Sequence, residues 1–171
     1  MSIHNEHPFL PAEGDRNPVR RLRGRLASPV TVLTAEHDGQ RAGLTVSSLL
    51  VVDGEPGSVI AVIDPLSELR EALQSSAAAV VNLLGWQHRQ LADAFGYVAP
   101  APGGPFRLAD WTSTRWGPAL DGAQAWAGCR LSDRPVIEVG WGLQVQLDIE
   151  HIEIGPDGEG LVHHRGRYHQ L

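Results

Sequence analysis

A run of hydroxyl side chains follows an apolar strand in the first third of the chain, and these residues could bind an anion. The run consists of Thr45, Val46, Ser47 and Ser48. Hydroxyl donors placed where a strand ends lie beside free backbone N–H groups, and together these groups can hold a phosphate. The alternative interpretation is a solvated strand end whose serines hydrogen-bond only to their own backbone.

The basic residues exclude several common sites. All 14 lysine and arginine positions are arginine, because the chain contains no lysine. A Walker P-loop and a Schiff-base mechanism each need a lysine amine, so both are excluded. No strand is followed by Gly-x-Gly-x-x-Gly, which excludes a Rossmann dinucleotide site. The formal charge of −6 argues against a nucleic-acid surface, and we interpret the arginine-rich residues 20–25 as a solvated helix face.

Cysteine and hydropathy patterns indicate a cytoplasmic protein that does not enter a membrane. No window is long and apolar enough to span a bilayer, and residues 1–15 lack the apolar core of a signal peptide. The single cysteine, Cys129, cannot form an internal disulfide, which is typical of a reducing compartment. Its apolar neighbours favour a buried structural thiol over a nucleophile. No Cys/His spacing suggests zinc, and we expect no metal site.

Helix signals are found at three places in the chain. Residues 1–16 are polar and unpatterned, and we predict a flexible N-terminal arm there, followed by one domain over residues 17–171. Asn17 and Pro18 are typical of a helix start and predict a short helix that ends near residue 26. Two central helices are expected, one opened by Asp64 as its cap and one over residues 87–95.

The remaining pattern is mainly β. Strands are predicted over residues 30–35, 44–46, 49–52, 58–63, 78–84, 123–131, 136–139, 143–154 and 161–164. Asp38 and Gly39 form a hairpin signal between the first two. The unbroken apolar run at residues 58–63 predicts a fully buried strand. The expected fold is a small antiparallel barrel with helices around it.

Five segments resemble, in order, those of a known family. They are residues 29–34, 43–48, 80–84 with the helix after them, 117–126 and 163–168. Residues 43–48 are similar to the motif Gly-aromatic-Thr-Ala-Ser-Ser of the flavin reductase-like family of FMN-binding split barrels, and residues 80–84 are similar to its Val-Asn-Val-Leu strand. The resemblance extends over nearly the whole chain from Pro29 onward.

The resemblance implies a split β-barrel that holds FMN, with FAD possible, at the interface of a homodimer. It also implies reduction of the flavin by NADH or NADPH, often for a partner monooxygenase. The flavin carries the hydride chemistry, so no catalytic residue is assigned. The residues implied in cofactor binding are Thr45, Val46, Ser47, Ser48, Asp64, Ser67, Asn82 and Arg165.

Two departures from the family pattern leave alternatives open. Where the family often carries Gly-Asp-His, this chain has Gly140, Trp141 and Gly142. Trp141 could stack on a flavin or nicotinamide, or it could lie in the core or at an interface. Asp64 is electrostatically unfavourable beside a phosphate, and Leu69 stands where the family tends to carry threonine. A split-barrel protein that binds FMN without fast NAD(P)H oxidation is therefore the alternative function, and a scaffold without flavin is a third.

Overall fold

The computed structural model describes residues 17–171, and the predicted arm over residues 1–16 lies outside the described residues. The predicted N-terminal helix is confirmed as α1 (Pro18–Gly24). The Asn17 side chain accepts a hydrogen bond of 2.8 Å from the backbone N–H of Val19, which caps the helix. No helix among the described residues is long and apolar enough to cross a membrane.

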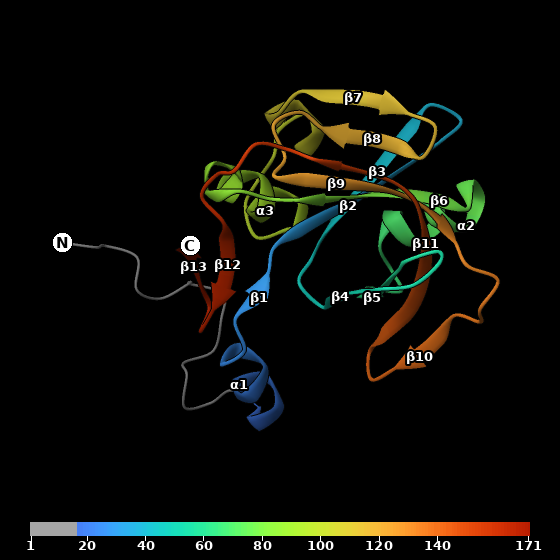
Figure 1. Cartoon of the computed structure of the whole chain (residues 1–171). Helices are drawn as coiled ribbons and strands as arrows, with labels where there is room; N and C mark the ends of the chain where they lie inside the picture. Colours follow the sequence, from blue (N-terminus) through green and yellow to red (C-terminus); the bar gives the residue numbers. More distant parts are fainter. Residues whose placement is uncertain (1–16) are drawn as a thin grey trace.

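A curled antiparallel sheet forms the body of the molecule (Figure 1). Its strands run in the order β3-β2-β6-β9-β11-β5-β4, and β10 pairs with β11. Their bounds are β2 (Thr31–His37), β3 (Gln40–Val46), β4 (Leu49–Val52), β5 (Ser58–Ile63), β6 (Ala78–Leu83), β9 (Ala125–Leu131), β10 (Ile137–Val139) and β11 (Gly142–Ile154). The predicted turn between β2 and β3 is present, with positive φ angles at Asp38 and Gly39, as a tight hairpin requires.

Two small sheets complete the β structure. One joins β1 (Ser28–Pro29), β12 (Leu161–His164) and β13 (Arg167–Gln170) beside α1, and the other is the hairpin of β7 (Trp111–Thr114) and β8 (Gly117–Leu120). Strands β7, β8 and β13 are not among the strands predicted from the sequence. These strands are four residues long, and β7 and β13 are mostly polar, so neither shows the apolar alternation of a longer strand.

Apolar residues fill both sides of strand β2. Leu33 and Ala35 face the barrel interior, where they pack with Leu69 and Leu73 of helix α2 (Glu68–Ser76). Val32 belongs to a second cluster under helix α3 (Arg89–Phe95), which follows the short 3-10 helix η2 (Trp86–His88). A further 3-10 turn, η3, spans Pro105–Leu108. The two clusters together hold the central helices against the sheet.

Helix α3 lies close to β3 because residue 43 is glycine. A Cβ built on Gly43 would lie 2.5 Å from the Phe95 ring, so any larger residue would push the helix away. The Thr45 hydroxyl also donates a 2.7 Å hydrogen bond to the carbonyl oxygen of Ala92 in α3. These contacts fix the end of β3, where the hydroxyl run begins.

Two local predictions were wrong. Strand β5 is not fully buried but alternates, with Val59, Ala61 and Ile63 turned inward, because only one face of this part of the sheet is covered. Helix α2 is capped by Ser67, not by Asp64, because the Ser67 hydroxyl is the group that reaches the N–H of Arg70.

Candidate functional site

Three neighbouring strands bring the predicted polar turn, Asp64 and Trp141 to one end of the sheet. The backbone N–H of Val62 donates a 2.9 Å hydrogen bond to the carbonyl oxygen of Ser48, on the β4 side of β5. On the other side, Leu143 of β11 is paired with Ile63. The residues just before β4, just after β5 and just before β11 therefore lie side by side. We call Ser47, Ser48, Asp64 and Trp141 the rim.

Only part of the predicted hydroxyl run is free to bind a ligand. Ser47 and Ser48 are exposed, and within residues 17–171 neither hydroxyl has a hydrogen-bond partner. The Thr45 hydroxyl is used by α3, and the Val46 side chain is buried in the barrel interior. These two residues can contribute only backbone groups, whereas the two serines present unused donors.

Asp64 and Ser67 form the turn that leads into α2. One carboxylate oxygen of Asp64 accepts a 2.8 Å hydrogen bond from the N–H of Leu66. The Ser67 hydroxyl donates to the Asp64 carbonyl oxygen at 2.7 Å and accepts from the N–H of Arg70. Ser67 is only 5% exposed. Its hydroxyl is therefore committed to the helix cap, while the exposed Asp64 keeps a negative charge on the rim.

Asn82 is a core residue in this structure. Its side-chain amide donates to the carbonyl oxygen of Val32 at 3.0 Å and to the Thr34 hydroxyl at 3.1 Å. Its oxygen accepts from the N–H of Leu120 at 2.8 Å, and the residue has no exposed surface. The side chain joins β6, β2 and β8, so it supports the walls of the barrel.

Arg165 belongs to the C-terminal hairpin. It occupies the turn between β12 and β13 with a positive φ, and its backbone N–H donates to the carbonyl oxygen of Gly24 beside α1. The structure thus places Arg165 with the N-terminal helix. The predicted set of cofactor residues is therefore divided between the rim, the core and the C-terminal hairpin.

Tyr97 lies near Asp64 of the rim and is not among the predicted site residues. It follows α3 and is 67% exposed. Its pKa is raised by partial burial of the phenol and by the carboxylates of Glu68 and Asp64, so the phenol lies within electrostatic reach of both. A positive φ at this tyrosine turns the chain just after Gly96, the C-cap of α3.

Cys129 is confirmed as a buried thiol. Its side chain has no exposed surface, and burial, followed by the charges of Glu150 and Asp148, raises its pKa to about 12. A thiol that stays protonated is a poor nucleophile.

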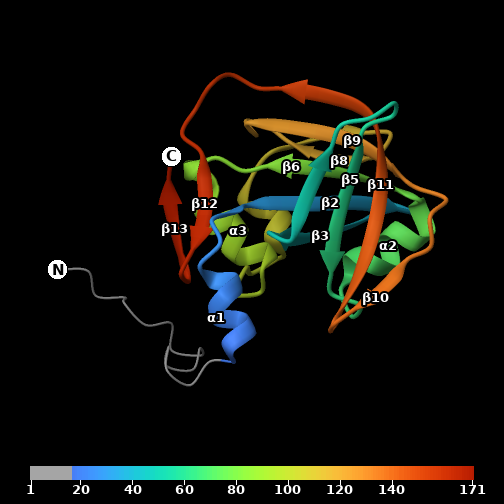
Figure 2. The same cartoon turned by 60° about the horizontal axis from the view of Figure 1, so that its bottom comes forward.

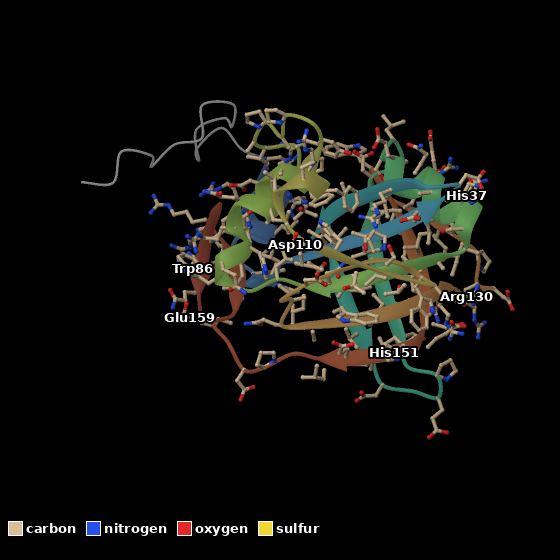
Figure 3. All side chains as sticks on the ribbon, turned by 90° about the horizontal axis from the view of Figure 1, so that it is seen from above. His37, Trp86, Asp110, Arg130, His151 and Glu159 are labelled. Atoms are coloured by element: carbon tan, nitrogen blue, oxygen red, sulfur yellow. The ribbon has the colours of Figure 1, made fainter. Side chains whose placement is uncertain are left out.

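The ion pair of Glu150 with Arg130, and His151 beside it, lie at the opposite edge of the molecule from Trp86 and Glu159 (Figure 3).

A hollow of about 360 Å³ lies close to the rim, between α2 and the β10–β11 hairpin. Ile63, Leu73 and Val145 give it an apolar lining, with Arg70 and Glu138 among the remaining lining residues. None of the residues from Thr45 to Ser48 lines it. We place the candidate site at the rim because a ligand with many acceptor atoms needs the hydroxyl donors found there.

The rim suits one part of a flavin better than another. Free hydroxyls and an exposed indole fit a flat ring with a hydrogen-bonding edge and a polyhydroxyl chain. The Asp64 carboxylate does not fit a phosphate dianion, because like charges repel.

Comparisons with known proteins agree with this chemistry. The family described as flavin reductase like domain matches residues 23–171. An FMN reductase (NADH) RutF of Ancylobacter novellus is 30% identical over 157 residues, which cover 91% of this chain and 85% of that protein. The 4-hydroxyphenylacetate 3-monooxygenase reductase component of Pseudomonas aeruginosa is 28% identical, covering 93% of this chain and 94% of that protein.

The fold also matches a solved structure. The NADH:FAD oxidoreductase SgcE6 of Streptomyces globisporus C-1027, in complex with NAD and FAD fragments, has a TM-score of 0.81 at 22% identity, covering 95% of this chain and 96% of that chain. The predicted split barrel with two central helices and a short N-terminal helix is confirmed. The chain belongs to the flavin reductase-like family.

Proposed function

We propose that this protein is a flavin reductase that transfers a hydride from NADH or NADPH to FMN, with FAD also possible. The observation that carries the proposal is the placement of two free serine hydroxyls and an exposed indole at one end of the sheet, in a chain of the flavin reductase-like family. The relatives named FMN reductase (NADH) make NADH the first donor to test. A role as the reductase component of a two-component monooxygenase belongs to the same proposal.

The chain's own residues hold the flavin and leave the hydride chemistry to it. Ser47 and Ser48 donate hydrogen bonds to the flavin, and Thr45 and Val46 offer backbone groups beside them. Ser67 and Asn82 act as positioning residues, because the first orders the turn behind Asp64 and the second joins three strands. When bound, the flavin supplies the hydride acceptor, so the protein needs no acid–base pair of its own.

Anaerobic stopped-flow absorbance tests the proposal. Mixing the protein with FMN and NADH, or NADPH, should bleach the flavin absorbance far faster than mixing without protein. The double variant S47A/S48A should raise the KM for FMN about tenfold, because two hydrogen bonds to the ligand are lost. Ser75→Ala, at an exposed serine on α2, is the matched control and should behave as the wild type. If neither nucleotide accelerates bleaching, the proposal is wrong.

We also propose that the protein is a homodimer and that it is cytoplasmic. Residues 17–171 form its single domain in this proposal. Strand β4 supports the dimer, because it ends the sheet and carries the exposed apolar residues Leu50 and Val51. An apolar edge strand without charge or proline is usually covered by another element or chain.

The second candidate function is flavin binding without fast nicotinamide oxidation. Gly140, Trp141 and Gly142 favour it, since the family's Asp-His pair is absent at this turn. In that case the protein should bind FMN while turnover with either nucleotide stays at background. Trp141→Asp and Gly142→His, combined with Val62→Ala to remove the methyl group 2.5 Å from the new Cβ, would then raise turnover.

A further inference from the structure

Trp141 is the most exposed tryptophan side chain recorded for residues 17–171, with 84% of its surface in solvent. It follows Gly140, whose φ of 57° is the one that the first central position of a type II′ turn requires. The turn needs glycine at its first position but places no demand on its second. Tryptophan is usually largely buried, so an indole at this exposed position indicates a ligand or partner.

Gly142 holds this turn tightly against β5. A Cβ on Gly142 would lie 2.5 Å from a methyl carbon of Val62 and 3.3 Å from the carbonyl oxygen of Ile63. Strand β11 can therefore approach β5 more closely here than a side chain would allow. Figure 2 shows β5 and β11 side by side with β10 at their foot. The backbone of this turn is thereby held at the same end of the sheet as Ser47 and Ser48, with β5 between the two segments.

None of the four rim residues carries a positive charge that would attract a phosphate. The two free hydroxyls are neutral, and the exposed Asp64 adds a negative charge. Of the other predicted phosphate partners, Ser67 is used as a helix cap and Arg165 lies beside α1. A flavin ring is neutral and flat, and it offers acceptor atoms at its edge. The rim therefore matches the ring and opposes the charged end of FMN.

We propose that Trp141 stacks on the isoalloxazine ring at the rim, and that the protein recognises its flavin by the ring and not by the phosphate. The substrate class is then flavins in general, with riboflavin bound as well as FMN. This inference rests on the proposed flavin reductase function, and it adds a specificity-determining residue and a substrate range to it. Tyr97, also exposed near Asp64, adds aromatic surface on the same side.

Equilibrium binding without nicotinamide nucleotide tests the inference. The protein is titrated with riboflavin and, separately, with FMN while tryptophan and flavin fluorescence are followed. The two Kd values should agree within about threefold, because an exposed phosphate contributes little. Trp141→Ala should weaken binding of both flavins about tenfold, as loss of a stacking partner does, whereas Trp141→Phe should weaken it by less than about threefold.

The matched control is Ile137→Ala on β10, because Ile137 is half exposed on the same hairpin. It should bind both flavins as the wild type does, and sedimentation should give all variants the same oligomeric state. Wild-type affinity in Trp141→Ala overturns the stacking proposal, and so does an equal loss in Ile137→Ala with a change of oligomeric state. FMN binding tighter than riboflavin by more than about tenfold overturns recognition by the ring.

The two proposals fail in different ways. If flavins bind as expected but neither nucleotide reduces them, the reductase function is wrong and the role of Trp141 stands. If NADH reduces FMN quickly while Trp141→Ala binds and turns over flavin as the wild type does, the reductase function stands and the inference is wrong. If the wild-type protein binds no flavin, both are wrong.

Discussion

At the scale of single residues, a side chain that already makes its hydrogen bonds within the protein plays a structural role, whereas one without such bonds can bind a ligand. Ser47 and Ser67 are the same residue type near the same end of the sheet, yet one is exposed and the other is 5% exposed as a helix cap. A hydroxyl that already bonds to two backbone groups gains little from a ligand, because binding would only exchange one hydrogen bond for another. The free serines are therefore the ones expected to affect flavin binding.

Asp64→Asn should increase the affinity for FMN and leave the affinity for riboflavin unchanged. Asparagine keeps an oxygen for the N–H of Leu66 but removes the negative charge. The expected gain for FMN is about twofold to fivefold, since an exposed charge pair contributes at most about 1 kcal/mol. Fluorescence titration at low salt measures it. Asp53→Asn, at the far end of the β4–β5 hairpin, is the control, and an equal gain for riboflavin would contradict the prediction.

Asn82→Ala should destabilise the protein by about 2–4 kcal/mol, because it leaves the buried N–H of Leu120 without an acceptor and opens a cavity. Urea denaturation followed by circular dichroism measures the change. The folded variant should bind FMN with an unchanged Kd. Asn17→Ala removes only an exposed cap and should cost about 1 kcal/mol or less. A lost affinity for FMN with unchanged stability would instead make Asn82 a ligand.

At the scale of elements, the short helix η2 depends on a neutral histidine. The Nδ1 atom of His88 accepts a 3.1 Å hydrogen bond from the N–H of Gly85. Burial lowers the pKa of His88 below its ordinary value of 6.5. The folded state therefore binds a proton less readily than the unfolded state. The stability that neutral His88 contributes is fully present above the pKa that this histidine has in the unfolded chain. It is lost as the pH falls from that value toward the lower pKa of His88 in the folded protein.

The urea concentration at the midpoint of unfolding should accordingly decrease as the pH is lowered from about 7.5 to about 5.5. His88→Asn keeps an acceptor near the Gly85 N–H but cannot titrate in this range, so its midpoint should fall less. Burial also lowers the pKa of His163 in β12, which accounts for the decline that remains. His37→Asn, at an exposed end of β2, serves as control. If the urea midpoint of the His88 variant fell with pH as steeply as that of the wild type, this assignment would be wrong.

At the scale of the whole molecule, one patch of exposed apolar residues lies on β4 and the far half of β11. Val51 and Val52 line a hollow of about 410 Å³ together with Ile149 and Ile152. Leu50, at the edge of the sheet, is 64% exposed. Apolar surface of this kind on an edge strand favours pairing with another chain.

Val51→Asp should convert the proposed dimer into a monomer, because a carboxylate buried at a contact would lack a partner. Analytical ultracentrifugation should give the wild type twice the mass of one chain and the variant the mass of one. Leu108→Asp places the same charge at another exposed leucine, on η3, and should remain dimeric. A monomeric wild type at micromolar concentration would contradict the dimer.

The amino-acid sequence by itself determined the mainly β architecture, the start of α1 and the hairpin at Asp38 and Gly39. These features depend on local signals such as apolar alternation, a cap and a turn dipeptide, and each signal needs only near neighbours. The ordered segments also indicated the flavin reductase-like family, which the family match over residues 23–171 confirms. Strands β7 and β13 were not predicted, because short polar strands show no apolar periodicity.

Only the tertiary structure decided which polar residues are free and where the indole lies. Asn82 is occupied because Leu120, 38 residues later, donates to it, and no local pattern contains that information. The alternative of a core position for Trp141 is wrong because the β10–β11 turn projects beyond the sheet and leaves the side chain 84% exposed. Burial and hydrogen-bond occupancy depend on contacts between distant segments, so they appear only when the chain is folded.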